Sequence, residues 1–260
     1  MENGTLSSVK FSGCKCRKTA SFDFKLKKRG KKFNVYKGRM HSCCADIQYA
    51  AVKARANEKG SSSDLVDYVI ALEAAINIAL RFSKCFKNNL TVQFPELHLA
   101  VMDNVSVFNK LFCKGSRALS SEEYVLFEPY IKDLKYFVTA EGIVTDACPV
   151  VIQELCHFSY HESNGMNVLR GLRGAWEKNG KSFRLASPST KYFVEKCTES
   201  EIPCAINNFF QTHRCTAVCE KWLVPNQKQG APAAMDISTS GACGPVMELP
   251  PSYSYIVESH

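Results

Sequence analysis

The feature that most constrains the fold is an alternation of apolar and polar residues on both sides of a glycine-containing turn, within residues 19–39. Apolar residues occupy every second position from Phe22 to Leu26, and they alternate again at Phe33 and Val35. Because successive side chains of a strand point to opposite faces, this spacing predicts two strands that share an apolar face. Gly30 can adopt the positive φ of a tight turn. The segment is therefore predicted to form a β-hairpin.

Positive charge is concentrated in the same part of the chain. Residues 1–40 contain twelve lysines and arginines and only two acidic residues, which gives this segment a charge of +10. The whole chain carries +8, so the remainder carries −2. Such clustering favours a polyanionic partner, nucleic acid before an anionic membrane surface, although a solvated face or a nuclear-localisation signal has the same composition. The predicted nucleic-acid-binding residues are Lys15, Arg17, Lys18, Lys25, Lys27, Lys28, Arg29, Lys31 and Lys32.

The cysteine content and the absence of export signals bear on where the protein is located. The chain has thirteen cysteines, and its first eleven residues contain no apolar segment of the secretory type. No uncharged apolar stretch is long enough to span a bilayer. We therefore expect an intracellular protein, in the cytoplasm, the nucleus or both, with reduced or metal-bound cysteines.

Two short cysteine and histidine clusters flank the predicted hairpin and suggest a metal site. The hairpin would bring its two flanks together, and thiolates with an imidazole are ligands that tetrahedral Zn²⁺ prefers. Zinc is therefore the candidate cofactor, and the alternative is a set of scattered reduced cysteines. The predicted ligands are Cys14, Cys16, His41 and Cys43, with Cys44 adjacent.

A second group of possible ligands lies near the end of the folded part, within a helix predicted from Pro203 to about Leu223. Cys215 and Cys219 are four residues apart and would share one helix face, whereas His213 would lie on another. This mismatch, in a group that also includes Cys197 and Cys204, favours buried structural cysteines over a single zinc site.

A third group, around residues 148–161, does not predict catalysis. Cys156 and His157 are adjacent and would point to different sides of a helix, so they cannot form a nucleophile–base pair. His157 and His161 share a face but lack the glutamate of the zinc-protease helix motif. Structural histidines are the favoured interpretation. Gly180-Lys181-Ser182 is not a phosphate-binding loop, because Ala175 replaces the required glycine. With no other catalytic motif, the chain is predicted not to be an enzyme.

The C-terminal segment contains a short recognition motif. Residues 225–252 are rich in Pro, Gly, Ala and Ser, which is typical of a flexible tail. Within it, Pro250-Pro251-Ser252-Tyr253 matches the P-P-x-Y peptide that WW domains bind, with Tyr253 as the aromatic anchor. The motif resembles the one that viral matrix and Gag-like proteins use to recruit ubiquitin ligases. It predicts a WW-domain partner, and the alternative is an incidental proline pair.

These patterns together predict an α+β protein with three parts. A basic, Cys-rich β-hairpin unit would occupy residues 1–56, a mainly α-helical body residues 64–224, and a flexible tail residues 225–260. The helices of the body are predicted at residues 64–86, from the capping box at 120–123 to Val138 with a break at Pro129, at 148–160, at 166–178 and at 203–223.

The predicted function is nucleic-acid binding, to RNA or another single-stranded nucleic acid, with low sequence specificity. The basic N-terminal residues would neutralise phosphates. The alternative is a viral-type structural or accessory protein, of matrix, capsid or host-interaction type, with a WW-domain-binding tail. The oligomeric state is left open.

Overall fold

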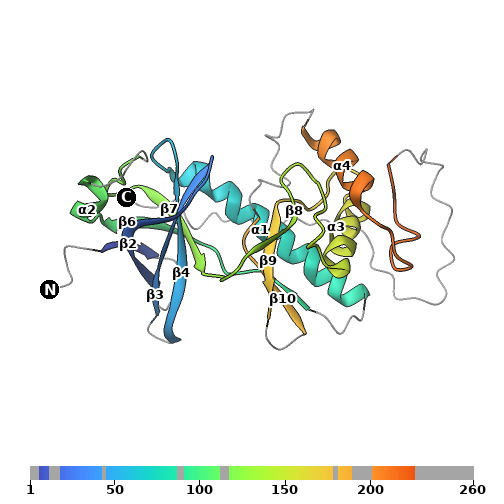
Figure 1. The fold of residues 1–260 in the computed structure, drawn as a ribbon, viewed down its shortest axis with the longest axis horizontal. Helices are drawn as coiled ribbons and strands as arrows, with labels where there is room; N and C mark the ends of the chain where they lie inside the picture. The colour runs from blue at the N-terminus through green and yellow to red at the C-terminus, as the bar shows by residue number, and fades with distance from the viewer. Residues whose placement is uncertain are drawn as a thin grey trace.

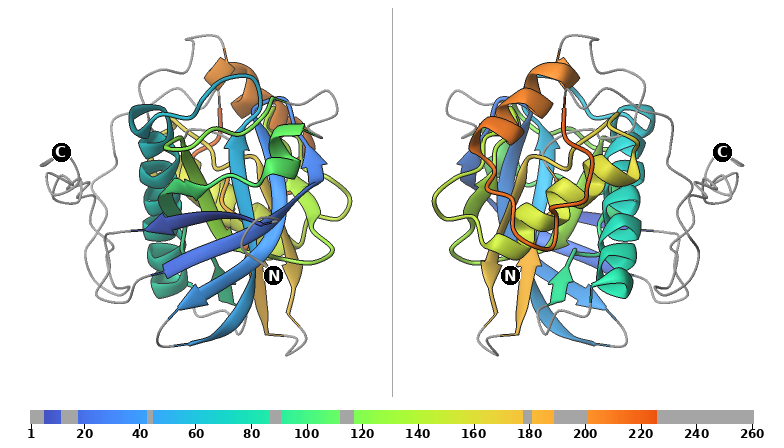
Figure 2. Two further views of the ribbon diagram at one scale, coloured as in Figure 1. Left: turned by 90° about the vertical axis from the view of Figure 1, so that its left-hand side faces the viewer. Right: turned by 90° about the vertical axis from the view of Figure 1, so that its right-hand side faces the viewer.

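The structure is a computed structural model, and it describes residues 6–11, 18–42, 45–86, 91–111, 117–177, 181–188 and 201–225. Within these residues, two β-sheets lie side by side and a long helix runs along both of them (Figures 1 and 2). None of the described helices is long and apolar enough to cross a lipid bilayer.

The first sheet is a closed barrel with strand order β1-β2-β3-β4-β7-β6. All of its pairings are antiparallel, and β2, β3 and β4 follow one another as a meander. Closure leaves no free edge among these six strands. Their bounds are β1 Ser7–Phe11, β2 Lys18–Arg29, β3 Phe33–Ser42, β4 Ala45–Arg55, β6 His98–Asn104 and β7 Tyr124–Pro129.

The alternation in the sequence fills the inside of this barrel. Phe22 and Tyr36 are almost completely buried, and their ring centroids lie 5.0 Å apart. Tyr36 stands opposite Val52 on β4, and Val52 stands opposite Phe127 on β7. The apolar face of the hairpin is therefore one wall of a barrel core that it shares with strands from later in the chain.

The second sheet has four strands in the order β5-β10-β9-β8 and is packed against helices. The pairing of β10 with β5 is parallel, and the others are antiparallel. Its core includes Ile152, Leu155, Leu172, Leu185 and Phe209. The elements not yet given are β5 Thr91–Gln93, α2 Val107–Leu111, β8 Lys135–Val138, α3 Val150–Glu162, β9 Leu172–Trp176, β10 Ser182–Leu185 and α4 Glu201–Thr212.

Helix α1, Ser62–Cys85, joins the two halves. Ser61 caps its first turn, where the Ser61 Oγ accepts a hydrogen bond from the backbone N–H of Asp64 at 3.2 Å. The first half packs Leu65 and Tyr68 against the barrel, and the second half packs Ala79 and Phe82 into the core of the second sheet. The predicted helix at 64–86 is thus present, from Ser62 to Cys85.

The predicted hairpin is present as β2 and β3, but the predicted fold class is wrong. The chain after residue 56 is not a mainly helical body, because it supplies two barrel strands and the whole second sheet. The hairpin is accordingly not a separate unit, since β4 and β7 complete its barrel.

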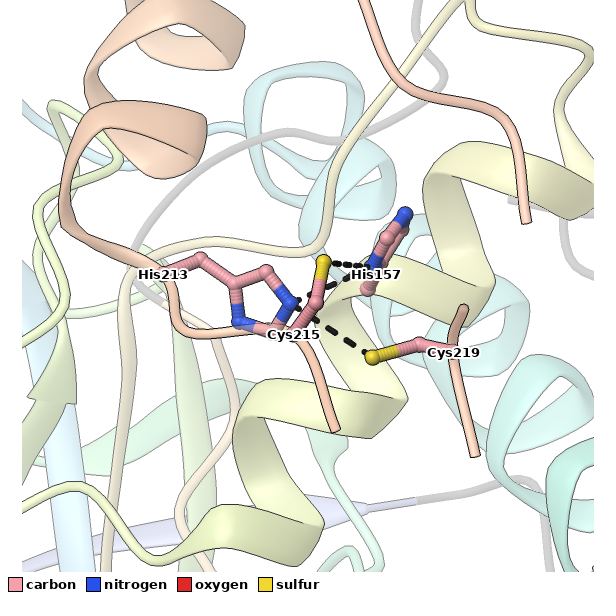
Figure 3. Close-up of side chains that lie close together, drawn as sticks. All are labelled: His157, His213, Cys215 and Cys219. Carbon is pink, nitrogen blue, oxygen red and sulfur yellow. Dashed lines mark hydrogen bonds between the residues drawn. The ribbon is translucent and has the colours of Figure 1, made fainter. Parts of the chain in front are cut away.

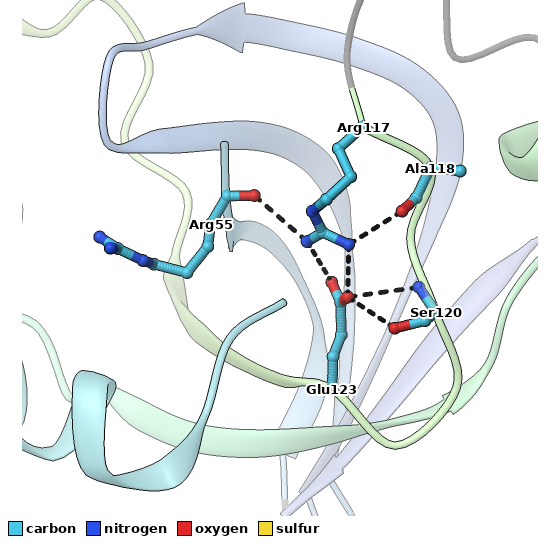
Figure 4. Close-up of polar contacts among 5 residues, drawn as sticks. All are labelled: Arg55, Arg117, Ala118, Ser120 and Glu123. Atoms are coloured by element: carbon cyan, nitrogen blue, oxygen red, sulfur yellow. Dashed lines mark hydrogen bonds and ion pairs between the residues drawn. The ribbon is translucent and has the colours of Figure 1, made fainter. Parts of the chain in front are cut away.

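The helix predicted from the capping box at 120–123 is also absent, and strand β7 begins at Tyr124. Figure 4 shows the reason. Glu123 is fully buried, and its carboxylate accepts hydrogen bonds from the Arg117 guanidinium at 2.7 and 3.0 Å and from the Ser120 hydroxyl at 3.0 Å. The Ser120–Glu123 spacing therefore closes a loop around an ion pair instead of capping a helix.

The helix predicted at 166–178 is replaced by strand β9. Gly171 has φ of +66°, which does not continue a helix. A Cβ atom at Gly174 would lie 2.5 Å from the carbonyl oxygen of Arg184, so β9 and β10 approach closely only because this residue is glycine. The helix predicted at 148–160 is present as α3, and the one predicted from Pro203 is present as α4 but ends at Thr212.

Candidate functional site

The two sheets meet at a buried lysine. Lys53 on β4 stands in an otherwise apolar strand segment, and its side chain is only 6% exposed. Its Nζ lies 2.5 Å from the Oε1 of Glu128 on β7 and donates a hydrogen bond of 2.5 Å to the Oγ of Ser187, just after β10. The lysine therefore connects the barrel to the second sheet.

Glu128 completes the connection from the barrel side. Its carboxylate is 4% exposed, and both oxygens accept from protein donors: Oε1 from Lys53, and Oε2 from the backbone N–H of Ser187 at 3.1 Å. A buried charge pair is stable only when its remaining hydrogen-bonding capacity is satisfied, and this pair meets the condition through Ser187.

A more exposed polar group lies beside this pair. Lys28 at the end of β2 donates a hydrogen bond of 2.5 Å to the phenolic oxygen of Tyr136 on β8. Arg173 on β9 hydrogen-bonds to the same tyrosine and acts electrostatically on Lys53. Together these residues form the Lys53 junction, defined as Lys28, Lys53, Glu128, Tyr136, Arg173 and Ser187.

The charges of the Lys53 junction perturb one another. Burial lowers the pKa of Lys53, an effect that Glu128 opposes and Arg173 reinforces. The pKa of Tyr136 is lowered chiefly by the hydrogen bond from Lys28, with the charges of Lys28 and Arg173 adding to it. The junction thus contains three basic side chains and one carboxylate, an excess of positive charge.

A second polar group lies on the far side of the second sheet, between α3 and the segment that follows α4 (Figure 3). His157 and His213 are joined at 3.1 Å between Nδ1 and Nε2, Cys215 Sγ lies 3.7 Å from His157 Nδ1, and Cys219 Sγ lies 3.8 Å from His213 Nε2. One atom from each of the four residues lies within 4.8 Å of the others. These four residues are called the His/Cys cluster.

The spacing of the His/Cys cluster suits a tetrahedral metal ion. With Zn–N and Zn–S bonds of about 2.0–2.3 Å, the ligand atoms of such a centre lie roughly 3.3–3.8 Å apart. His157 Nε2 is 2.9 Å from the carbonyl oxygen of Leu223. Donation of Nε2–H to that carbonyl leaves the lone pair of Nδ1 directed at the cluster, as in many zinc sites. Two imidazoles and two thiols are also a donor set that zinc prefers.

The protonation state of the two histidines agrees with a role as metal ligands. Burial lowers the pKa of His157, and burial together with His157 lowers that of His213 to about 4, so both imidazoles are neutral near pH 7. Burial, and then the neighbouring Cys219, raises the pKa of Cys215. A bound cation would relieve this repulsion between thiolates. The Nδ1 of His213 is buried without a hydrogen-bond partner.

This cluster combines residues that the sequence analysis had placed in two separate groups. The argument against His213 sharing a site with Cys215 and Cys219 assumed a helix to Leu223, but α4 ends at Thr212 and the three residues follow it in an irregular segment. His157 comes from α3, and nothing in the sequence links it to His213. Cys204 lies on α4 and is exposed, and Cys197 is outside the described residues.

Two of the basic residues near the N-terminus are paired with carboxylates. Lys18 is paired with Glu96 at 2.6 Å, and Lys10 with Asp103 at 2.5 Å, so carboxylates from later in the chain neutralise both. Lys28 belongs to the Lys53 junction. The predicted residues Lys25, Lys27, Arg29, Lys31 and Lys32 lie exposed on or beside the β2–β3 turn, and Lys15 and Arg17 fall outside the described part.

The remaining predicted site residues are largely beyond what the structure describes. Of the metal ligands predicted at the hairpin, Cys14, Cys16 and Cys43 lie outside the described residues, and His41 Nε2 lies 3.2 Å from the Oγ of Ser21. Pro250, Pro251 and Tyr253 are also outside them. Both the hairpin metal site and the WW-domain motif remain predictions from the sequence.

Comparison with known proteins places this fold. The sequence profile of the Alpha-kinase family matches residues 28–219. No curated protein matches the chain. Among solved structures, an alpha kinase from Entamoeba histolytica is 12% identical with a TM-score of 0.57, covering 83% of this chain and 89% of its own.

Two structures of the alpha-kinase domain of myosin heavy chain kinase A show the same likeness. The complex with ADP is 15% identical, with a TM-score of 0.54, and the inactive domain complexed with ATP is 16% identical, with a TM-score of 0.54. Each alignment covers 84% of this chain and 96% of the other. At these identities the likeness establishes the fold.

These matches contradict three predictions from the sequence. The chain was predicted not to be an enzyme, yet it matches a family of kinases. The predictions of nucleic acid as the partner, and of a viral structural or accessory protein, fail with the same finding. The physical reason is that the hairpin charges belong to strands of a closed barrel, where Lys18 is paired with Glu96, rather than to a free cationic arm.

Proposed function

This chain belongs to the alpha-kinase family, and from that premise we propose that the Lys53 junction binds the phosphate groups of ATP or ADP, the first requirement of a kinase. The observation that carries the proposal is the buried pair of Lys53 and Glu128 where the two sheets meet. Protein kinases use a strand lysine, paired with a glutamate, to hold the phosphates of ATP. Lys53 has the same chemistry, with its glutamate on a neighbouring strand.

The charge of the surrounding residues supports the proposal. Lys53 is paired with one carboxylate, and Arg173 acts electrostatically on Lys53. Lys28, at the end of β2, donates to Tyr136, which Arg173 also contacts. A guanidinium can bind phosphate oxygens in a two-pronged geometry, and an ammonium acts as a point charge beside it. A diphosphate would supply the negative charge that the junction lacks.

Calorimetric titration with ADP and ATP tests the proposal. The single variant Lys53→Met would leave Glu128 unpaired, so the test uses Lys53→Met with Glu128→Gln, which removes both charges. The wild type is expected to bind, and the double variant to lose at least tenfold in affinity. Lys37→Met is the matched control, because Lys37 is an exposed barrel lysine that lies over the ring of Tyr49. Equal affinity in the double variant and the control would refute the assignment.

We further propose that the His/Cys cluster holds zinc as a structural ion. His157 would bind through Nδ1, His213 through Nε2, and Cys215 and Cys219 through their thiolates. The ion would link α3 to the segment after α4 through its four ligands. That segment also packs Trp222 against Phe82 and Phe158. No ligand position is left for substrate, which is the usual condition of a structural site.

Metal analysis of the purified protein tests this second proposal. We expect one zinc per chain, lost in Cys219→Ser and retained in Cys204→Ser, which changes an exposed cysteine on α4. Retention of zinc in both variants would point to another site, including the hairpin cysteines. A reducing, intracellular compartment is proposed on the same basis, since the thiolates must stay unoxidised to bind metal.

A further inference from the structure

The polar atoms around Lys53 do not suit the divalent cation that kinases generally use. Magnesium requires near-octahedral coordination by oxygen, usually with carboxylate ligands, and protein kinases supply an aspartate for it. The charged groups that act on Lys53 are Glu128 and Arg173. Glu128 is the carboxylate that pairs with Lys53 there.

Glu128 is already committed to other partners. Its Oε1 accepts from the Lys53 ammonium and its Oε2 from the backbone N–H of Ser187. The side-chain oxygen of Ser187 accepts from the same ammonium. A magnesium ion would have to displace these donors and then lie beside Lys53 and Arg173, both cations. The site does not fit the ion.

Arg173 has the opposite property, an unused donor. Its Nε is buried and has no hydrogen-bond partner, although its guanidinium also reaches Tyr136. A buried cationic N–H without an acceptor is costly, and an anion placed beside it would remove that cost. Lys28 lies at the same tyrosine and adds a third positive charge.

We propose that the Lys53 junction binds nucleotide phosphates without a divalent cation, with Arg173 and Lys28 taking the place that magnesium has in other kinases. The inference rests on the proposed nucleotide site and concerns how that site neutralises its ligand. The oxygens of the phosphates would accept from Arg173 and from the two ammonium groups. The preferred ligand is therefore the metal-free nucleotide anion, because its full charge meets three cations.

The test is a titration of the full chain with ADP in magnesium-free buffer and again with saturating Mg²⁺. Magnesium is removed from the buffer with a chelating resin, because EDTA in solution would also extract zinc from the His/Cys cluster. We expect binding in magnesium-free buffer, with an affinity that Mg²⁺ leaves unchanged or lowers. Binding that appears only with Mg²⁺ would overturn this inference and leave the proposed function intact. Absence of binding in both buffers would overturn the proposed function itself.

Variants identify the groups that replace the ion. Arg173→Gln is expected to lower the affinity for ADP in magnesium-free buffer by roughly tenfold or more, since it removes a charged hydrogen-bond donor. Lys28→Gln changes an exposed residue, and a loss of several-fold is expected. Arg184→Gln is the control, because Arg184 lies on the neighbouring strand β10 and pairs with Glu177. Loss in the control equal to that in Arg173→Gln and Lys28→Gln would overturn the assignment.

Discussion

The Lys53 junction and the His/Cys cluster are both assembled from distant segments, but they differ in how their buried atoms are satisfied. In the junction, the carboxylate of Glu128 and the ammonium of Lys53 are bonded to each other and to Ser187. In the cluster, one donor atom from each of two histidines and two cysteines lies within 4.8 Å of the others. The first arrangement repels a cation, and the second has the donor atoms to bind one.

The comparison shows that the charge of a site is decided by its counter-ions rather than by its residue types. The basic residues of the junction outnumber their carboxylates, so an anion completes them. The ligands of the cluster are neutral or anionic when they bind, so a cation completes them. The following experiments test this difference, from the largest expected effect to the smallest.

The largest effect should follow the loss of zinc. Cys219→Ala removes a buried ligand and with it the link between α3 and the segment after α4, so we expect a loss of about 4–5 kcal/mol in the free energy of unfolding. Chemical denaturation with and without stoichiometric zinc measures it. Cys204→Ala should change stability by no more than about 0.5 kcal/mol. If the Cys219→Ala protein were as stable as the wild type, the cluster would not hold a structural metal ion.

The buried charge pair should give the next largest effect. Lys53→Met leaves the Glu128 carboxylate uncompensated, and we expect a loss of about 3–5 kcal/mol in the free energy of unfolding. The double variant with Glu128→Gln should recover much of this loss, because no buried charge remains. A double-mutant cycle measures the coupling. Additive effects of the two substitutions would mean that the pair is not coupled as the structure shows.

A carboxylate placed in the junction should reverse its preference for ions. Ser187→Asp puts an acidic group next to Lys53, so we expect ADP affinity to fall in magnesium-free buffer and to recover with Mg²⁺, each by roughly tenfold, or about 1.4 kcal/mol. The control is Ser187→Asn, because asparagine has the shape of aspartate without its charge. Its affinity for ADP should not depend on Mg²⁺. If the affinity of the Ser187→Asp variant for ADP did not change with Mg²⁺, the nucleotide phosphates would bind elsewhere.

The smallest effect concerns pH. The pKa of Lys53 is lowered from 10.5 by burial. Between its folded pKa and 10.5, the unfolded chain binds more protons than the folded one, so this residue makes stability rise as pH rises through that window. Below the folded pKa its cost is fully present. Comparing the pH slopes of the wild type and the Lys53→Met, Glu128→Gln variant isolates the contribution. Parallel slopes would show that the pKa of Lys53 is not lowered.

Local patterns predicted those elements whose stability is local. The hairpin of β2 and β3 and the helices α1 and α3 follow from alternation, helical spacing and capping residues. The same method failed at β7 and β9. In β7, four consecutive buried residues have no alternation that would distinguish a strand from a helix. In β9, the close approach of β10 decides the conformation at Gly174. The contacting residues, Arg184 and Leu185, are too far along the chain for a local pattern to include them.

The two functional clusters were beyond prediction for a related reason. One signal was available for the junction, a single lysine in the apolar segment Ala50–Ala54, because a buried lysine requires a partner. Its partner Glu128 is 75 residues away, at the end of a strand that had been predicted as helix. His157 and His213 are 56 residues apart, and their pairing depends on where α3 and α4 end.

The sequence by itself determined the hairpin, the bridging helix α1 and the supply of cysteines, histidines and lysines, because backbone propensity and periodicity act over a few residues. Only the tertiary structure decided that the barrel closes, that Lys53 meets Glu128 and Ser187, and that His157 faces His213, Cys215 and Cys219. These contacts join segments far apart in the chain. Their charges and lone pairs acquire a function only when folding removes them from water and brings them within bonding distance.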